Sequence, residues 1–149
     1  MEIIESKTEM PKHYVIELLL EHEITPTQQR IEIAHILFAR PQHVSAEQVL
    51  AQLNCEKQKA SKATIYNTLG LFARKGLIRE IIVDPTKVFY DSNTSDHHHF
   101  FNVDTGTLSD IDDGHMVVTN LPVPPEGTVG ECVDIIYRVR NAEPHLNSL

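Results

Sequence analysis

The change of hydrophobic period at Gly76 constrains the fold of this chain more than any other feature. Before Gly76, apolar residues recur at helical spacings of three and four. After it, "LIREIIVDPTKVFYD" contains two β-rich runs around "DPTK", where proline suits the second position of a turn. These runs predict a β-hairpin. Several helices followed directly by a two-stranded ribbon predict a winged helix-turn-helix domain.

Four helices are expected before the hairpin. Their predicted ranges are Pro11–His22, Thr25–Arg40, Ser45–Leu53 and Ser61–Gly76. Thr25 is the expected N-cap of the second helix, with Pro26 in the first helical position. Ser45 and Gln48 form a capping-box pair at the start of the third. Gly76 tolerates the left-handed conformation that often ends a helix.

The fourth helix has the pattern of a DNA-recognition helix. Its expected core face comprises Ile65, Leu69, Phe72 and Ala73, and its expected outer face comprises Thr64, Asn67, Thr68, Leu71 and Lys75. A helix in the major groove needs polar side chains that reach base edges and flanking cations that reach phosphates. This helix has both. A plain amphipathic surface helix is the alternative interpretation.

The formal net charge of −8 is unevenly distributed. Residues 1–91 carry 11 basic and 12 acidic side chains, whereas residues 92–149 carry 2 and 9. Between Lys57 and Arg79 there are six basic side chains, including Lys62, and no acidic one. A basic stripe on an acidic chain can bind phosphates where it touches them. A solvated helix face explains the stripe equally well.

Composition and the termini bear on the class of protein. A hydrophobic fraction of 41% and a charged fraction of 23% are those of a soluble globular protein. No long apolar stretch is present, and "MEIIESKTEM" lacks the features of a signal peptide, so we expect a cytoplasmic protein with no membrane partner. Cys55 and Cys132 have no CxxC spacing, which excludes a four-cysteine zinc site and favours reduced thiols.

The polar segment "SNTSD" is the natural boundary between two domains. The expected organisation is a winged-helix domain over residues 1–91, a hinge over 92–96 and a second domain over 97–149. Beyond the hinge we expect a strand at "HHHFFNV", a turn at "DTG", a strand at "TLSDI", a loop at "LPVPPEGTVG" and a last strand at "ECVDIIYRVR". The predicted fold class is therefore α+β.

Three consecutive histidines begin the second domain. In a strand, His97 and His99 share one face about 6.6 Å apart, while His98 points to the other. Two imidazoles at that spacing can bind one ion if further ligands arrive from elsewhere. Asp91, Asp110 and His43 are the candidates. A set of nitrogen and oxygen ligands without thiolate suits Fe²⁺, Mn²⁺ or Zn²⁺.

The register of the second hairpin decides whether Asp110 can join these histidines. A strict three-residue loop at "DTG" would pair Asp110 with Phe100, on the face of His98. A glycine in the left-handed conformation often introduces a bulge. Such a bulge at Gly106 would shift the register by one residue and place Asp110 on the face of His97 and His99. Both registers stay open at this point.

Three segments together resemble the ferric uptake regulator (Fur) family of bacterial metalloregulators: "RPQHVSAEQVL", "SKATIYNTLGLFARKGLI" and "TSDHHHFFNVDTGTLSDI". The stretches "IYNTL" and "DPTKVFYDSNTSDHHHFF" look most like its iron response regulator (Irr) branch. The resemblance implies a homodimeric repressor with an N-terminal winged helix-turn-helix domain and a small α/β dimerisation domain. Its double-stranded DNA operator would be near-palindromic and control genes of iron homeostasis and haem metabolism.

The resemblance also implies site residues. Its regulatory metal pattern falls on His43, Asp91, His97, His99 and Asp110, in agreement with the bulged register. DNA contacts fall on the helix that holds Tyr66 and on Arg30. With the outer face and the basic stripe, the expected DNA-binding residues are Arg30, Lys62, Thr64, Tyr66, Asn67, Thr68 and Lys75.

The chain departs from the family pattern at three points. Asn67 stands where many relatives have arginine after the tyrosine, so one guanine-seeking side chain is missing. The family's cysteine zinc site is absent. A second metal or haem site would use the histidine triplet with Asp96, and His115 is a candidate distal ligand. Haem is a second candidate cofactor because imidazole is an axial haem ligand, although the Cys-Pro haem motif of some Irr proteins is missing.

The expected mechanism is a shift of population. A metal ion held by both domains would favour the interdomain angle that suits DNA binding, and haem at the triplet would compete with it. A manganese- or zinc-responsive repressor without haem control is the nearest alternative. Two alternatives belong to other classes of protein. One is a metalloenzyme, which would need an open coordination position and a general base, and the other is a metal-storage protein. No HExxH-type element supports an enzyme.

Overall fold

The computed structural model describes residues 10–112 and 114–143 of the 149-residue chain. The chain divides into two compact units, Met1–Thr94 and Ser95–Leu149, here called the N-terminal and C-terminal units. Most of the N-terminal segment that argues against a signal peptide, residues 1–9, lies outside the described residues.

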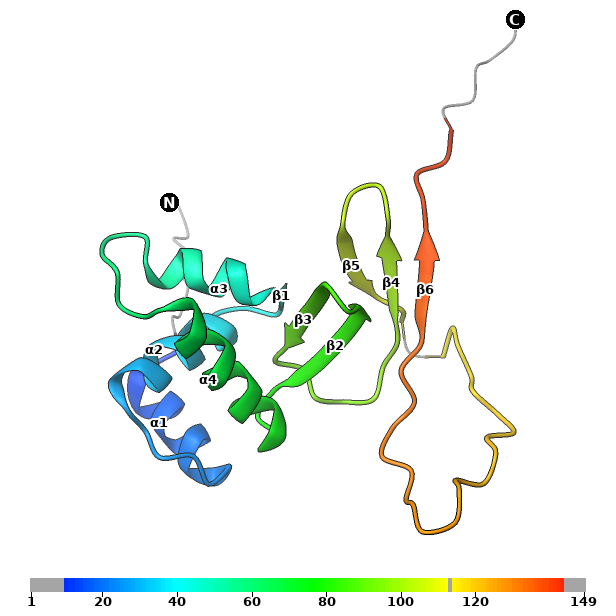
Figure 1. The fold of residues 1–149 in the computed structure, drawn as a ribbon, viewed down its shortest axis with the longest axis horizontal. Coiled ribbons are helices and arrows are strands. Elements are labelled where there is room, and N and C mark those ends of the chain that lie inside the picture. The colour runs from blue at the N-terminus through cyan, green and yellow to red at the C-terminus, as the bar shows by residue number, and fades with distance from the viewer. Residues whose placement is uncertain (1–9, 113, 144–149) are drawn as a thin grey trace, which may run out of the picture. The chain divides into compact units, whose positions relative to one another are not determined.

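The N-terminal unit combines four helices with a small antiparallel sheet (Figure 1). The helices are α1 (Lys12–Glu21), α2 (Gln28–Phe38), α3 (Ala46–Leu53) and α4 (Lys62–Arg74). The strands are β1 (His43–Val44), β2 (Arg79–Asp84) and β3 (Lys87–Asp91), in the order β1-β3-β2. The predicted helices and the hairpin around "DPTK" are confirmed.

One apolar core holds this unit together. Its fully buried side chains come from all four helices and include Val15, Leu19, Ile33, Leu37, Val49, Ile65, Leu69 and Phe72. The expected core face of α4 is confirmed for Ile65, Leu69 and Phe72, and Ala73 packs against the same core while half-buried. Burial of such side chains supplies most of the stability of a unit of this size.

The start of α2 differs from the prediction. Thr27, not Thr25, is the N-cap: its backbone is extended, and its hydroxyl accepts a 3.3 Å hydrogen bond from the amide of Arg30. Pro26 therefore precedes the helix instead of beginning it. Both threonines have the side chain that caps helices, and only the fold selects one of them. The Ser45–Gln48 capping box and the left-handed Gly76 after α4 are as predicted.

The sequence did not predict β1. Its two residues lie between α2 and α3 and pair with the end of β3, with His43 opposite Asp91. A two-residue strand has no periodicity, so a search for alternating apolar residues cannot find it.

The C-terminal unit contains a three-stranded sheet of order β5-β4-β6 (Figure 1). Its strands are β4 (His99–Asn102), β5 (Thr107–Asp110) and β6 (Ile136–Val139); β4 pairs antiparallel with β5 and parallel with β6. The strand expected from His97 begins at His99. The described residues of this unit contain no helix, so the α/β character expected of it is absent there, while the α+β class of the whole chain is confirmed.

None of the helices α1 to α4 in the described residues is long and apolar enough to cross a bilayer.

Candidate metal centre and candidate nucleic-acid interface

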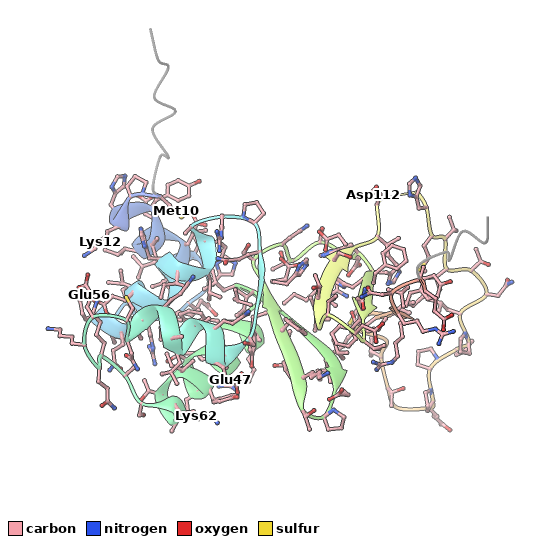
Figure 2. The ribbon with its side chains drawn as sticks, turned by 90° about the horizontal axis from the view of Figure 1, so that it is seen from above. Met10, Lys12, Glu47, Glu56, Lys62 and Asp112 are labelled. Carbon is pink, nitrogen blue, oxygen red and sulfur yellow. The ribbon has the colours of Figure 1, made fainter. Side chains whose placement is uncertain are left out.

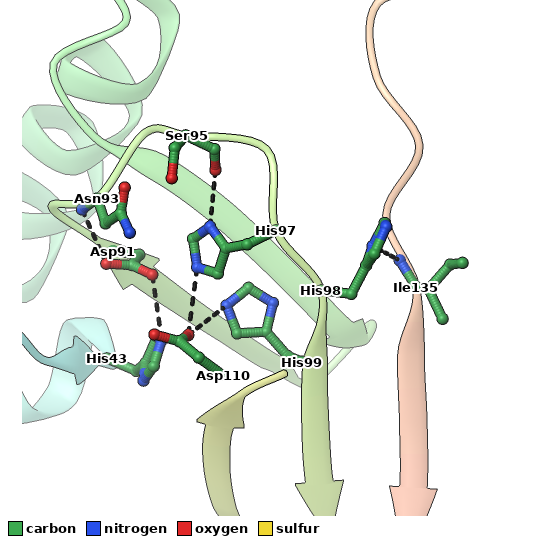
Figure 3. Close-up of polar contacts among 9 residues, drawn as sticks. All are labelled: His43, Asp91, Asn93, Ser95, His97, His98, His99, Asp110 and Ile135. Carbon is green, nitrogen blue, oxygen red and sulfur yellow. Dashed lines mark hydrogen bonds and ion pairs between the residues drawn. The ribbon is translucent and has the colours of Figure 1, made fainter. Parts of the chain in front are cut away.

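A histidine and an aspartate meet in the N-terminal unit because of β1. His43 and Asp91 are directly opposite on β1 and β3, so their side chains leave the same face of the sheet. Nε2 of His43 lies 3.1 Å from Oδ2 of Asp91 (Figure 3). Asp91 is only 3% exposed, and its Oδ1 accepts a 2.9 Å hydrogen bond from the amide of Asn93. The backbone therefore orients this buried carboxylate.

Two histidines and an aspartate meet in the C-terminal unit. His99 and Asp110 are opposite on β4 and β5, and His97 precedes β4. Nε2 of His97 and Nε2 of His99 each lie 3.2 Å from Oδ1 of Asp110, and the two ring centroids are 4.5 Å apart (Figure 3). Both imidazoles are buried. Two ring nitrogens thus converge on one carboxylate oxygen.

The register of β4 and β5 makes this convergence possible. The loop between them has four residues, from Val103 to Gly106, so Asp110 lies opposite His99 and not opposite Phe100. Gly106 has φ of +71°, and its amide donates a 2.8 Å hydrogen bond to the carbonyl of Asn102. The shifted register is the one observed, and the left-handed glycine closes the loop.

The hydrogen bonds of His97 define its tautomer. Its Nδ1 lies 2.7 Å from the carbonyl oxygen of Ser95, and because a carbonyl only accepts, Nδ1 carries a proton. The other ring nitrogen, Nε2, faces the carboxylate of Asp110 at 3.2 Å, so the lone pair that a neutral ring keeps on Nε2 is available to a cation. A histidine that binds a metal usually donates its other ring N–H to a carbonyl or carboxylate, as Nδ1 of His97 does here.

His98 has the opposite arrangement. Its Nδ1 accepts a 3.2 Å hydrogen bond from the amide of Ile135, so the neutral ring carries its proton on Nε2 (Figure 3). Neither nitrogen of this neutral ring then offers a lone pair to an ion. The three consecutive histidines are therefore not equivalent as ligands.

The donor atoms present fit a divalent ion. Within each unit taken by itself, imidazole nitrogen and carboxylate oxygen of described residues lie together without a thiolate. This chemistry suits Fe²⁺, Mn²⁺ or Zn²⁺. Cys55 and Cys132 are both exposed and are not bonded to each other.

The second predicted site is not assembled in the described residues. Asp96 and His98 line a hollow of about 360 Å³ in the C-terminal unit together with Glu131 and Cys132, which the sequence had not singled out, whereas His115 does not line it. Among the described residues of this unit, Asp96, His98 and His115 belong to no group that converges as metal ligands. Nδ1 of His97 and Nδ1 of His98 contact backbone groups, and Nε2 of His97 and Nε2 of His99 face Asp110. These contacts give no support to haem.

The predicted DNA-binding residues of α4 and its C-cap Lys75 divide into two groups. Lys62, Tyr66, Asn67 and Lys75 are exposed, and Thr64 is half-buried. Thr68, expected on the outer face, is only 8% exposed because it lies three residues after Ile65 and four before Phe72, on the buried side. Leu71, also expected outside, packs against the core.

Arg30 lies in the first turn of α2, close to α4. Its Nη1 donates a 3.0 Å hydrogen bond to the carbonyl of Thr25, which anchors the guanidinium. Arg30, Thr64, Asn67 and Thr68 line a common hollow of about 480 Å³. The structure thus brings together four residues that the sequence assigned separately to DNA binding.

Tyr66 contacts a residue that the sequence analysis missed. Its hydroxyl donates a hydrogen bond to the carboxylate of Glu47 in the first turn of α3. This bond lowers the pKa of Glu47 and raises the pKa of Tyr66. Nζ of Lys62 lies 5.8 Å from the centre of the Tyr66 ring. No local signal identifies Glu47, since 19 residues separate it from Tyr66.

Comparison with known proteins gives a family match over most of the chain. A family model described as the ferric uptake regulator family matches residues 21–120. The peroxide operon regulator of Bacillus subtilis (strain 168) is 30% identical over 96 residues, which cover 64% of this chain and 66% of that protein. The peroxide-responsive repressor PerR of Staphylococcus aureus (strain USA300) is 30% identical over 85 residues, 57% of each chain. The chain therefore spans less than two thirds of these relatives.

A solved structure has a similar fold. The ferric uptake regulator of Pseudomonas aeruginosa with manganese superposes with a TM-score of 0.64 at 21% identity, covering 90% of this chain and 100% of that one. At this identity the likeness concerns the fold.

Proposed function

The chain belongs to the ferric uptake regulator family, and on this premise we propose that it is a metal-responsive transcription regulator that binds DNA as a homodimer. The family consists of transcription regulators and not of enzymes, in agreement with the expectation that this chain is not an enzyme. The observation that carries the proposal is the convergence of His97 and His99 on Asp110 in a chain that also contains a helix-turn-helix unit.

The proposed sensor is one divalent ion bound by residues of both units. The N-terminal unit offers His43 and Asp91, and the C-terminal unit offers His97, His99 and Asp110. Only residues 92–96 separate Asp91 from His97, so the chain connection is short enough for a shared ion. An ion that needs ligands from both units stabilises the arrangement of units that provides them, and its binding shifts the population toward that arrangement.

The proposed reading surface is the exposed part of α4 with the start of α2. Asn67 can bond both N6 and N7 of an adenine in the major groove, while Lys62, Lys75 and Arg30 can bind phosphates. Two such helices in a dimer fit a near-palindromic operator. A protein with this role acts where the DNA is, in the cytoplasm.

The proposed signal is a divalent metal ion. Fe²⁺, Mn²⁺ and Zn²⁺ all match the donor atoms. The names of the two curated relatives add peroxide as a candidate signal. The Irr-like branch, control of iron and haem genes, and haem as an effector rest on the sequence resemblance alone.

The proposal is tested by replacing individual histidines of the triplet. His97→Ala combined with His99→Ala should lower the affinity for Mn²⁺ or Zn²⁺, measured by isothermal titration calorimetry, by at least the ~10- to 100-fold that loss of an outer-shell partner costs. His98→Ala is the matched control, since its Nδ1 accepts a backbone hydrogen bond. Equal losses in both variants would contradict the assignment of the ligands.

The regulatory role needs a separate measurement. Gel shifts with genomic fragments, with and without Fe²⁺, Mn²⁺, Zn²⁺ and haem, should show fragments that the wild-type protein retains only in one metal state. The affinity of the His97/His99 double variant for these fragments should be the same with and without metal. A protein that binds the ions but retains no fragment in any state would contradict the regulatory role and favour a metal-storage protein.

A further inference from the structure

Glu47 and Tyr66 form a contact on the proposed reading surface that the metal centre does not use. Glu47 lies in the first turn of α3 and Tyr66 in the second turn of α4, and both side chains are exposed. Figure 2 shows Glu47 and Lys62 near each other along one edge of the helical part of the unit. An acidic side chain is unexpected on a surface that meets phosphates, so its role needs a reason.

The direction of the hydrogen bond follows from the charge of Glu47. The bond from Tyr66, then a backbone hydrogen bond at Glu47 itself, hold the pKa of this carboxyl below its ordinary value, and the start of α3 favours negative charge. Glu47 is therefore ionised at neutral pH and can only accept. The same bond raises the pKa of Tyr66, so the phenol keeps its proton and directs it at Glu47.

Lys62 places its ammonium group over the Tyr66 ring. It stands four residues before Tyr66 on α4, with Nζ 5.8 Å from the ring centre, a distance suited to a cation–π contact. The ring thus has a cation near its face and a carboxylate at its hydroxyl. These contacts leave the oxygen lone pairs as the polar part of Tyr66 that remains available to a ligand.

We propose that Glu47 is a specificity-determining residue that turns Tyr66 into a pure hydrogen-bond acceptor toward DNA. This inference rests on the proposed DNA-binding function. A phenol whose single proton is committed cannot donate to phosphate oxygens or to O6 and N7 of guanine, which themselves only accept. It accepts instead from an exocyclic amino group, N6 of adenine or N4 of cytosine, in the major groove.

Glu47 also acts against unspecific binding. Its charge repels phosphates that approach Tyr66 and Lys62, so removing it strengthens attraction to any DNA while weakening the selection of an amino-bearing base. Removal of Glu47 should therefore raise the affinity for DNA of any sequence and lower the specificity for the operator. This combination distinguishes a role in specificity from a merely structural role of Glu47, because loss of a structural residue would lower the affinity for all DNA.

The first experiment uses the free protein and needs no DNA. Absorbance titration of tyrosine, with Tyr66→Phe to assign the signal, should show a lower pKa for Tyr66 in Glu47→Ala than in wild type. Glu47→Gln retains an acceptor and removes the charge, so its effect should be intermediate. Glu56→Gln removes an exposed charge from the same unit and should leave Tyr66 unchanged. An unchanged Tyr66 pKa in Glu47→Ala would overturn the proposal.

The second experiment tests base selection. Wild-type protein is used to select operators from random DNA, and each adenine and cytosine of the half-site is then replaced by an analogue that lacks the amino group. We expect one position where this deletion weakens wild-type binding ~10-fold but weakens Tyr66→Phe and Glu47→Ala less than ~2-fold. Glu56→Gln should behave like wild type.

The outcomes distinguish the two levels of the proposal. A wild-type protein that selects no sequence overturns the proposed function and the role of Glu47 with it, whatever the titration shows. A selected operator in which amino deletion affects wild type and Glu47→Ala equally overturns only the role of Glu47. Thermal unfolding followed by circular dichroism checks that each variant is folded.

Discussion

Single residues show why identical side chains next to each other can have different chemistry. Nδ1 of His97 donates a hydrogen bond to a backbone carbonyl, whereas Nδ1 of His98 accepts one from a backbone N–H. Both residues precede β4, and Figure 3 shows their rings on opposite sides of the chain, where they meet different backbone groups. Ligand capacity thus depends on the backbone groups beside each ring as much as on residue type.

This difference predicts distinct tautomers in solution. In a proton–nitrogen correlation spectrum of the neutral side chains, His98 should be protonated on Nε2. Added Zn²⁺ should shift the Nε2 signals of His97 and His99 and leave that of His98 in place. A zinc-dependent shift of the His98 Nε2 signal would contradict the assignment.

Tyr90 predicts a loss of stability at high pH. Burial, then the charge of Glu80, raises its pKa to about 12. The folded pKa lies above the unfolded value of about 10, so the contribution of the neutral phenol is complete below pH ~10 and is lost as pH rises toward 12. Urea unfolding at about pH 9 and about pH 11 should show a smaller decrease in Tyr90→Phe than in wild type. Equal decreases would mean that other groups cause it.

At the scale of elements, both ends of α4 are defined by local chemistry. The Ser61 hydroxyl accepts from the amide of Thr64 at 3.2 Å, and Gly76 adopts φ of +76° directly after the C-cap Lys75. These signals set the length of the helix that carries the proposed DNA contacts. They are also the reason that α4 could be predicted from the sequence alone.

The two glycines of this region should respond to alanine in opposite ways. Gly76→Ala places a Cβ in open space but in a left-handed conformation, which costs about 1–2 kcal/mol of unfolding free energy. Gly70 lies inside α4, and its added Cβ meets only the mobile end of Arg74 at 3.3 Å, so Gly70→Ala should gain about 0.5–1 kcal/mol. Urea denaturation measures both. A shared sign would show that packing outweighs backbone conformation.

At the scale of the whole molecule, the two units differ in their means of stability. The large apolar cluster consists entirely of residues of the N-terminal unit. The buried apolar residues described in the C-terminal unit are Phe101, Leu108 and Ile111. A three-stranded sheet with so few buried side chains has little to offset its loss of conformational entropy.

This asymmetry predicts the behaviour of fragments. Residues 1–94 expressed alone should show a helical circular dichroism spectrum and a cooperative thermal transition. Residues 95–149 alone should show no such transition, because their core is too small without a partner surface. A cooperative transition of the C-terminal fragment at low concentration would contradict this expectation.

Much of the fold was determined by the sequence itself. The helices were predictable because apolar spacing, the caps Ser45 and Ser61, and Gly76 act within one or two turns of the chain. The histidine triplet and the carboxylates were identified as candidate ligands because their chemistry does not depend on the fold. The α+β class followed from the order of these local signals.

Tertiary structure decided what depended on distant partners. It paired His43 with Asp91 through a strand too short to predict, and it chose the register that places Asp110 opposite His99. It buried Thr68 and joined Glu47 to Tyr66 across 19 residues. Local signals rank conformations of a short segment, whereas strand pairing, register and cross-helix contacts depend on which segments meet when the apolar core closes.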